Sequence, residues 1–410
     1  MQLFQYCKIE RPQEALLLCQ QWLPAPLYKG LSRARKNWPG NCSSVAIYTS
    51  NKNQVRRHMS GPNAAAATTP QPEEQLKKNR LEAFLCVQAG AQRLSIEHQQ
   101  RLSGGAIQEN WLLDVSVEGG THAGRQRWVL RSDAQSVVQG SLSRAQEFAV
   151  LGTVHRAGVK VPRPLWLCED TSVHGRAFFI MEWVSGITAG HRLTGQLGAE
   201  GDPQLVAELG ANLARIHCIV PAHDRLEFLG DPQQVSVQST IDAQRGVLDR
   251  LGVNQPVLEW ALRWCESNAP KSAAPCLLHG DFRTGNYLAE AGRLQAVLDW
   301  EFTGWGDPRQ DIGWFTARCW RFARPDLEAG GIGTLEHFLR GYREVSPLRF
   351  ERDELVFWQV MATLRWAVIA QQQAQRHLSG EEPSLELALT GRLIPELEQD
   401  LLRLTTGVRR

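Results

Sequence analysis

Apolar and polar residues alternate along short stretches in the first half of the chain. Residues 110–117 and 128–131 show the period of two that is typical of half-buried strands, with a glycine-rich turn between them. The apolar runs at residues 165–168 and 177–182 predict a second pair of strands. Between the two pairs, residues 143–157 carry apolar side chains at helical spacing. We therefore predict a small antiparallel sheet crossed by one helix.

The pattern becomes helical after residues 183–186, where a glycine follows the last predicted strand. Residues 205–219 and 355–375 are the clearest amphipathic helices in this second part. An α+β fold with two lobes is expected: an N-terminal lobe at residues 76–183 and a helical C-terminal lobe at residues 184–410.

Residues 1–75 differ from the rest of the chain because turn formers and small residues dominate and no period is sustained. We expect this extension to be disordered. Met59 opens a low-complexity stretch, so the native protein is hypothesised to start there.

Composition narrows the class of protein. A chain of 410 residues exceeds what one core usually serves, and its net charge of +2 predicts no recruitment of nucleic acid. The nine cysteines are scattered and form no Cys-x-x-Cys pair, which indicates reduced thiols in a cytoplasmic protein. No run approaches the roughly 18 apolar residues of a membrane span, so no membrane partner is expected.

The candidate chemistry lies around residues 276–299. An apolar strand runs into a turn at Asp281, and two further strands joined at residues 291–292 read as a hairpin. The midpoint of this hairpin pairs Asn286 with Asp299 beside Asp281. Three oxygen-bearing side chains are therefore predicted to converge.

Carboxylate and amide oxygens suit Mg²⁺, so Asn286 and Asp299 are predicted metal ligands, with the substrate phosphates completing the site. Asp281 is then free to orient a nucleophile. This arrangement is what phosphoryl transfer from ATP needs, because positioning and charge neutralisation supply most of the catalysis. The His-x-Asp-x-x-x-x-Asn spacing at residues 279–286 is also that of the kinase catalytic loop.

The runs at residues 279–286, 297–301 and 306–308, followed by Asp311, resemble the aminoglycoside phosphotransferase family of small-molecule kinases. The resemblance extends over residues 100–400 and is closest to the kinase-like domain that some proteins carry fused to an acyl-CoA dehydrogenase. It implies a bilobal protein-kinase-like fold and ATP and Mg²⁺ as cofactors.

The resemblance also implies roles for individual residues. Asp281 would be the catalytic base, Asn286 and Asp299 the metal ligands, and His279 a structural support of the loop. Further residues would hold the nucleotide: Ser103, Gly104 and Gly105 over the phosphates, Arg131 on the phosphates and paired with Glu147, and Glu182, Trp183 and Val184 against the adenine.

Several of these residues have simpler interpretations. Arg131 and Glu147 could form a surface ion pair and nothing more. Asp307 is read as a turn residue before Pro308, and Asp311 as the N-cap of a helix starting at residue 312. His217 is interpreted as a hydrogen-bonded helix residue. The tryptophans, including Trp300, Trp305, Trp314 and Trp320, are expected to pack in the core or the cleft.

The acceptor is predicted to be a hydroxyl of a small molecule. An aminoglycoside would favour acidic residues, of which the candidates are Glu381, Glu382, Glu386 and Glu396. A hydroxyacyl-CoA or another anionic metabolite would favour basic ones, namely Arg318, Arg321, Arg324, Arg365 and Arg376. A nucleotide-binding pseudokinase is the third alternative. The choice between ATP and GTP and the oligomeric state stay open at this point.

Overall fold

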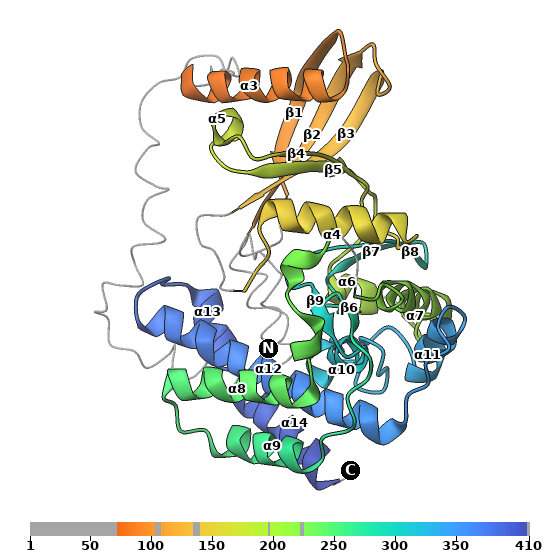
Figure 1. Ribbon diagram of the computed structural model, residues 1–410, viewed down its shortest axis with the longest axis vertical. Helices are drawn as coiled ribbons and strands as arrows, with labels where there is room; N and C mark the ends of the chain where they lie inside the picture. The colour runs from red at the N-terminus through yellow and green to blue at the C-terminus, as the bar shows by residue number, and fades with distance from the viewer. Residues whose placement is uncertain (1–71, 103–107, 134–139, 196, 222–224, 408–410) are drawn as a thin grey trace, which may run out of the picture. The chain divides into compact units, whose positions relative to one another are not determined.

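The computed structural model describes residues 72–102, 108–133, 140–195, 197–221 and 225–407. From Leu76 onward, these residues belong to one compact unit. Within it, a β-sheet is followed along the chain by a mainly helical region (Figure 1).

The sheet contains five antiparallel strands in the order β1-β2-β3-β5-β4. Their bounds are Arg93–Arg101 (β1), Gln108–Glu118 (β2), Gly124–Asp133 (β3), Pro164–Cys168 (β4) and Phe178–Glu182 (β5). The helices of this part are α3 (Pro72–Gln88), α4 (Arg144–Arg156) and the short α5 (Thr171–His174). Strand β5 ends next to the predicted boundary between the lobes.

The two faces of the sheet are covered by different helices, as the period of two along a strand requires. Ile180 of β5 shares a core with Leu81 of α3, whereas its neighbour Phe179 belongs to the core that includes Val150 of α4. Arg131 of β3 pairs with Phe179 across the sheet, so it lies on the α4 side. The alternation of side chains along β3 therefore places the charged residue Arg131 on the face of the sheet that is directed toward the helical region.

The four predicted strands and the predicted helix are confirmed, and Ser143 caps α4 through a capping box. The sequence reasoning missed β1 and α3. Strand β1 is an edge strand in which only Leu94 and Ile96 are buried, so it lacks a sustained apolar alternation. Helix α3 begins inside the segment predicted to be disordered; the remainder of that prediction, residues 1–71, lies outside the described residues.

The helical region contains nine α-helices within the part of the chain that the structure describes. These are α6 (Gly190–Gly195), α7 (Pro203–His217), α8 (Val237–Leu251), α9 (Pro256–Ser267), α10 (Arg309–Thr316), α11 (Leu335–Arg343), α12 (Arg352–Leu378), α13 (Leu385–Gly391) and α14 (Ile394–Thr406). Four short strands accompany them: β6 (Cys276–Leu278), β7 (Tyr287–Glu290), β8 (Arg293–Val297) and β9 (Gly304–Gly306). Three 3₁₀ turns lie at Glu227–Leu229, Pro232–Gln234 and Arg318–Trp320. The two predicted amphipathic helices correspond to α7 and α12.

Two hydrophobic cores hold this region together. One joins α4 to α7, α10 and α11, and therefore ties the sheet to the helices. The other is built from α8, α9, α12 and α14. Among the described helices, none is both long and apolar enough to cross a membrane.

Candidate active site

Residues 279–286 form a loop between β6 and β7, held by two strand pairs, β6 with β9 and β7 with β8. The hairpin turn has positive φ at both Ala291 (49°) and Gly292 (72°), as a two-residue turn of type I′ requires. Gly280 has a φ of 80°, and a Cβ there would lie 2.1 Å from the carbonyl oxygen of Phe302. The loop can therefore take its path only with glycine at this position.

The predicted register of the hairpin is wrong by one residue. The pairing shifts between Leu288 and Ala289, and the amide of Leu298 donates to the carbonyl of Asn286 at 2.8 Å. Asn286 therefore lies opposite Leu298, and Asp299 follows one position later with a φ of 67°. The cause is the position of the turn, which pairs Glu290 with Arg293 and by itself would place Asn286 opposite Val297. The bulge adds one residue to β8 and brings the register one position closer to the predicted one.

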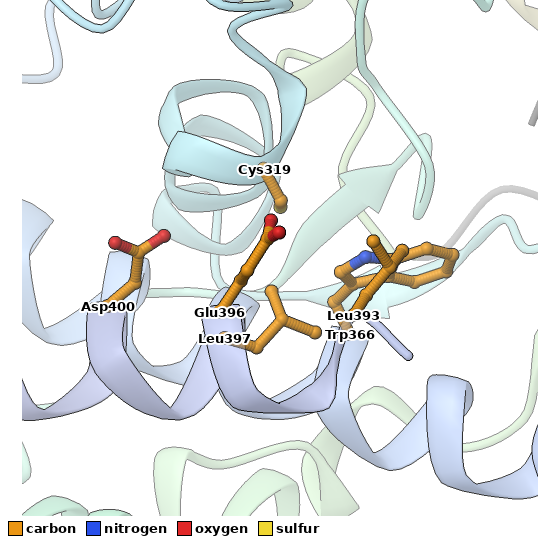
Figure 2. Close-up of a pocket in the computed structure, with 6 residues that line it drawn as sticks. All are labelled: Cys319, Trp366, Leu393, Glu396, Leu397 and Asp400. Atoms are coloured by element: carbon orange, nitrogen blue, oxygen red, sulfur yellow. The ribbon is translucent and has the colours of Figure 1, made fainter. Parts of the chain in front are cut away.

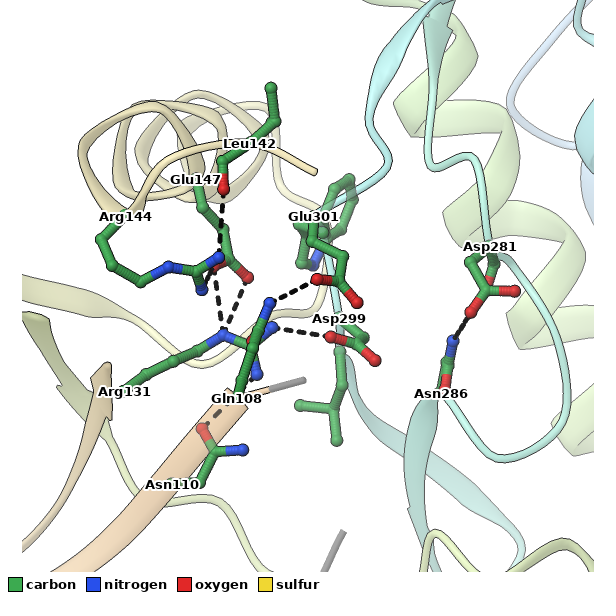
Figure 3. A network of polar contacts seen from close by, with 12 residues as sticks. Gln108, Asn110, Arg131, Leu142, Arg144, Glu147, Asp281, Asn286, Asp299 and Glu301 are labelled. Carbon is green, nitrogen blue, oxygen red and sulfur yellow. Dashed lines mark hydrogen bonds and ion pairs between the residues drawn. The ribbon is translucent and has the colours of Figure 1, made fainter. Parts of the chain in front are cut away.

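The Asp281 carboxylate receives hydrogen bonds on both oxygens and is only 9% exposed. Asn286 Nδ2 donates to Oδ2 at 2.6 Å (Figure 3). Trp314 Nε1 donates to Oδ1 at 2.7 Å. Arg283 Nε lies 3.1 and 3.3 Å from the two oxygens. Donors on both oxygens fix the plane of the carboxylate.

Arg131 links the sheet to the catalytic segment. Its Nε lies 3.0 Å from Glu147 Oε1, and its Nη2 donates to Asp299 Oδ1 at 2.6 Å (Figure 3). Glu147 also pairs with Arg144. Because Arg131 and Glu147 are 7% and 1% exposed, they are a buried pair, and the surface interpretation is wrong. Asp299 is turned toward Arg131, so of the three oxygen-bearing side chains only Asp281 and Asn286 are joined directly.

The pKa values of two carboxyl groups near Arg131, those of Asp299 and Glu301, are shifted in opposite directions. Burial tends to raise the pKa of Asp299, but the charge and hydrogen bond of Arg131 outweigh it and hold this pKa below its ordinary value. Burial, together with the charge of Asp299, raises the pKa of Glu301 to about 8. Gln108 Nε2 donates to Glu301 at 2.5 Å and connects β2 to the segment after Asp299.

His279 supports the loop as one defined tautomer. Its Nε2 lies 2.9 Å from the carbonyl of Leu298 and must donate, so its Nδ1 accepts from the amide of Asp281 at 3.1 Å. Burial lowers the pKa of His279, which keeps the ring neutral as this arrangement requires. The contacts agree with the supporting role predicted for this residue.

Asp311 anchors the start of the loop instead of capping a helix. Its two oxygens accept from the amides of His279 (2.7 Å) and Gly280 (3.0 Å). The predicted N-cap role is wrong, since α10 already begins at Arg309, whose amide donates a hydrogen bond to Asp307. Asp311 is nevertheless structural, as predicted, and it accounts for the hydrogen bond of His217, whose Nε2 lies 3.3 Å away.

We expect Asp311→Asn to destabilise the fold by about 1.5–3 kcal/mol at pH 7, because amides of the loop lose a charged acceptor. Burial alone would raise the pKa of Asp311, but His217 and His279 hold it below the ordinary value. The contribution is therefore present above the unfolded-state pKa and lost as the pH falls through the folded-state pKa. Urea unfolding between pH 3 and pH 8 measures it.

The control for this experiment is Asp170→Asn, which changes an exposed helix cap whose carboxylate accepts from the amide of Ser172. An asparagine can cap equally well, so this control should change stability less. A stability loss for Asp311→Asn that is the same at every pH would contradict the charge-based explanation.

The remaining predicted nucleotide residues are placed only in part. Ser103, Gly104 and Gly105 lie outside the described residues, between the ends of β1 and β2. Glu182 ends β5, and its amide and that of Trp183 already donate to the carbonyls of Arg163 and Arg127. Val184 makes no backbone hydrogen bond to another described residue.

The residues proposed to choose the acceptor are mostly engaged within the chain. The arginines suited to an anionic acceptor all contact other protein groups, namely Arg318, Arg321, Arg324, Arg365 and Arg376. Arg376 in fact pairs with Glu382, one of the acidic candidates. The charge of these arginines therefore does not by itself favour an anionic acceptor.

A cavity away from the predicted site is lined by acidic and apolar side chains (Figure 2). Its walls are Cys319, Trp366, Leu393, Glu396, Leu397 and Asp400. Two carboxylates without a basic residue in the lining do not suit a phosphate group. None of the predicted nucleotide or catalytic residues contributes to it.

Sequence reasoning missed the contact of Trp314 with Asp281. Trp314 was expected to pack in the core, and it is 4% exposed, but its indole N–H is bonded to Asp281. Its position three residues after Asp311 in α10 is the only local signal, and that signal does not reveal the direction of the indole.

A five-stranded sheet followed by helices, with an aspartate and an asparagine in the loop before a hairpin, defines the class of kinase-like phosphotransferases. The phosphotransferase enzyme family (APH) matches residues 98–348, more than half of the chain, so the chain belongs to this family. The predicted family and α+β fold are thereby confirmed.

Relatives and solved structures agree with this membership. Acyl-CoA dehydrogenase family member 11 of Pongo abelii is 27% identical over 359 residues, which cover 82% of this chain and 44% of that protein. Family member 10 of Mus musculus is 26% identical over 296 residues, covering 68% of this chain and 27% of that protein. The chain thus spans less than half the length of these relatives, in line with the predicted resemblance to their kinase-like domain.

Two solved structures share the fold. A candidate aminoglycoside phosphotransferase from Ralstonia eutropha has a TM-score of 0.62 and 21% identity, covering 81% of this chain and 99% of that one. Spectinomycin phosphotransferase APH(9)-Ia, solved with ADP and spectinomycin, has a TM-score of 0.54 and 13% identity, covering 80% of this chain and 98% of that one.

Proposed function

We propose that this phosphotransferase moves the γ-phosphoryl group of ATP to a hydroxyl of a small molecule, with Mg²⁺ as cofactor and Asp281 as base. The observation that carries the proposal is the Asp281 carboxylate, held by donors on both oxygens in the same loop as Asn286. Such a group can accept a proton but has little freedom to turn.

In the proposed step, the acceptor oxygen forms a bond to the γ-phosphorus while the bond from that phosphorus to the bridging oxygen of ATP breaks. The hydroxyl proton passes to Asp281, and ADP leaves. Because the transition state of phosphoryl transfer is loose, the hydroxyl needs orientation more than early deprotonation. A carboxylate that already accepts hydrogen bonds from Trp314, Arg283 and Asn286 suits that task.

The side chains on the sheet side fit a nucleotide. Arg131 carries a charge that burial disfavours but that Glu147 and Asp299 stabilise, so its pKa lies above the ordinary value. We propose that this charge faces the phosphates, that residues 103–105 cover them, and that the amide of Val184 contacts the base. The solved relative that contains ADP supports a nucleotide in this fold.

The donor set also fits a hard cation. Asn286 uses its amide nitrogen on Asp281, which leaves its amide oxygen available, and Asp299 keeps one carboxylate oxygen beyond the one that bonds Arg131. When bound, Mg²⁺ would neutralise charge on the phosphates. Asn286 and Asp299 are the residues that would hold it.

Asn286→Ala is expected to raise the Mg²⁺ concentration for half-maximal turnover by on the order of tenfold or more, at least the effect of losing an outer-shell partner of a metal. Asp299→Ala should act in the same direction. The measurement is ADP release against Mg²⁺ at saturating ATP. Asn268→Ala, which changes an exposed asparagine at the end of α9, is the control; an equal Mg²⁺ requirement in all variants would refute the assigned ligands.

The acceptor is proposed to be a small molecule that carries a hydroxyl group. The similarity to acyl-CoA dehydrogenase family members supports a hydroxyacyl-CoA or another anionic metabolite as one candidate, and an aminoglycoside is the alternative. Purified protein screened with ATP and with GTP against hydroxylated metabolites, acyl-CoAs and aminoglycosides, with ADP or GDP release as readout, tests the proposal. No acceptor-dependent and no basal release with either nucleotide would favour the pseudokinase alternative.

A further inference from the structure

Trp314 directs its indole N–H at the candidate base from a different part of the fold. It lies in α10, and its Nε1 donates to Asp281 Oδ1 at 2.7 Å. Other buried indole N–H groups in this protein lack a hydrogen-bond partner: those of Trp320 and Trp358 have none within the described part of the chain. The contact of Trp314 is therefore not a general consequence of packing tryptophan in this core.

The indole of Trp314 is itself held in place. The guanidinium carbon of Arg365 lies 4.6 Å from the centre of the indole ring, a cation–π geometry. Arg365 Nη1 also donates to the carbonyl oxygen of Gly280 at 2.9 Å. One side chain of α12 thus fastens both the tryptophan and the loop that carries Asp281.

The three donors to Asp281 are not equivalent. Arg283 and Asn286 belong to the same loop as Asp281, two and five residues away, so they move with it. Trp314 is 33 residues away and lies in the helical core with Trp358. Among the three donors, Trp314 is therefore the one that links the Asp281 carboxylate to the packed helices.

We propose that Trp314 is a positioning residue for Asp281, holding the carboxylate in the orientation that receives the acceptor hydroxyl. This inference rests on the proposed function and assigns a role beyond the predicted catalytic set. Trp314 acts through Asp281 and needs no contact with the substrate. Arg365 completes the arrangement by clamping the indole face.

The activity test compares Trp314→Phe with Trp358→Phe. Both changes keep a ring and delete an indole N–H from the same core, but only the first N–H has an acceptor. Trp314→Phe should lower kcat by about 10- to 100-fold, the effect of losing a hydrogen bond to a charged group, while the KM for nucleotide stays near that of the wild type. Trp358→Phe should leave both constants close to wild type.

A spectroscopic test needs no activity. In ¹⁵N-labelled protein, the indole resonance that disappears in Trp314→Phe is that of Trp314, and Asp281→Asn should move it because the charged acceptor is gone. An unmoved resonance overturns the inference whatever the kinetics show. If Trp314→Phe does not fold, Asp281→Asn alone decides, since no shift of any indole signal would overturn the contact.

The kinetic outcomes separate the inference from the function on which it rests. If the wild type is active and Trp314→Phe has the same kcat, the positioning role is overturned and the proposed function stays intact. A fall in kcat that Trp358→Phe matches also overturns it, since packing would then be the cause. Absence of turnover by the wild type with either nucleotide removes the proposed function, and the positioning role with it.

Discussion

Asp281→Ala is expected to lower the rate of phosphoryl transfer by on the order of 100-fold or more, the contribution of one positioned base. The carboxylate is the group that would accept the acceptor proton, and no other carboxylate lies in residues 279–286. Steady-state ADP release at saturating nucleotide and Mg²⁺ measures the change. Nucleotide affinity should change much less, because Asp281 is assigned to the acceptor side of the transfer.

Two checks accompany this experiment. Asp353→Ala, an exposed carboxylate in the first turn of α12, should leave the rate unchanged. Melting curves separate a catalytic loss from unfolding, since the alanine removes the carboxylate that accepts hydrogen bonds from Trp314, Arg283 and Asn286. Activity of Asp281→Ala within a fewfold of the wild type would remove Asp281 from the mechanism.

Glu147→Gln is expected to destabilise the protein by up to about 3–5 kcal/mol, because removing one partner of a buried ion pair leaves buried charge that is less compensated. Glu147 is 1% exposed and pairs with both Arg131 and Arg144. A neutral amide in its place removes the carboxylate that two buried guanidinium groups share, and leaves Arg131 with Asp299 and Arg144 with Asp133. Urea unfolding followed by circular dichroism measures the loss of stability.

The matched control is Glu259→Gln. Glu259 also pairs with two arginines, Arg245 and Arg263, but its side chain is 48% exposed. Solvent-exposed pairs contribute about 1 kcal/mol or less. If both substitutions cost the same, the position of Arg131 does not depend on burial of its ion pair, and its assignment to the phosphates loses its structural support.

Much of the fold could be predicted because the relevant signals are local. The alternation in β2 and β3 and the helical spacing in α4 lie within short windows and were recognised. Strand β1 was missed because only two of its residues, Leu94 and Ile96, are buried hydrophobic side chains, and it is an edge strand. The pairing of β1 with β2 depends on the tertiary structure, and the residues of β1 carry no local signal for it.

The candidate site divides in the same way. The spacing from His279 to Asn286 and the Ala291-Gly292 turn determined a loop followed by a hairpin, since both depend on neighbouring residues and on turns that tolerate positive φ. The register error at Asn286 arose because the midpoint of the hairpin was placed too far along the chain, whereas the turn pairs Glu290 with Arg293. The bulge, which a count along the sequence cannot detect, makes this error one residue smaller.

By itself, the sequence determined the family, the α+β fold and the loop at residues 279–286. Only the tertiary structure decided which side chains contact them. Arg131 reaches Asp299 over a separation of 168 residues, and Trp314 reaches Asp281 over 33. Contacts of this kind depend on how the sheet and α10 pack against the loop, and packing directions are set by the assembled cores, which no local pattern records.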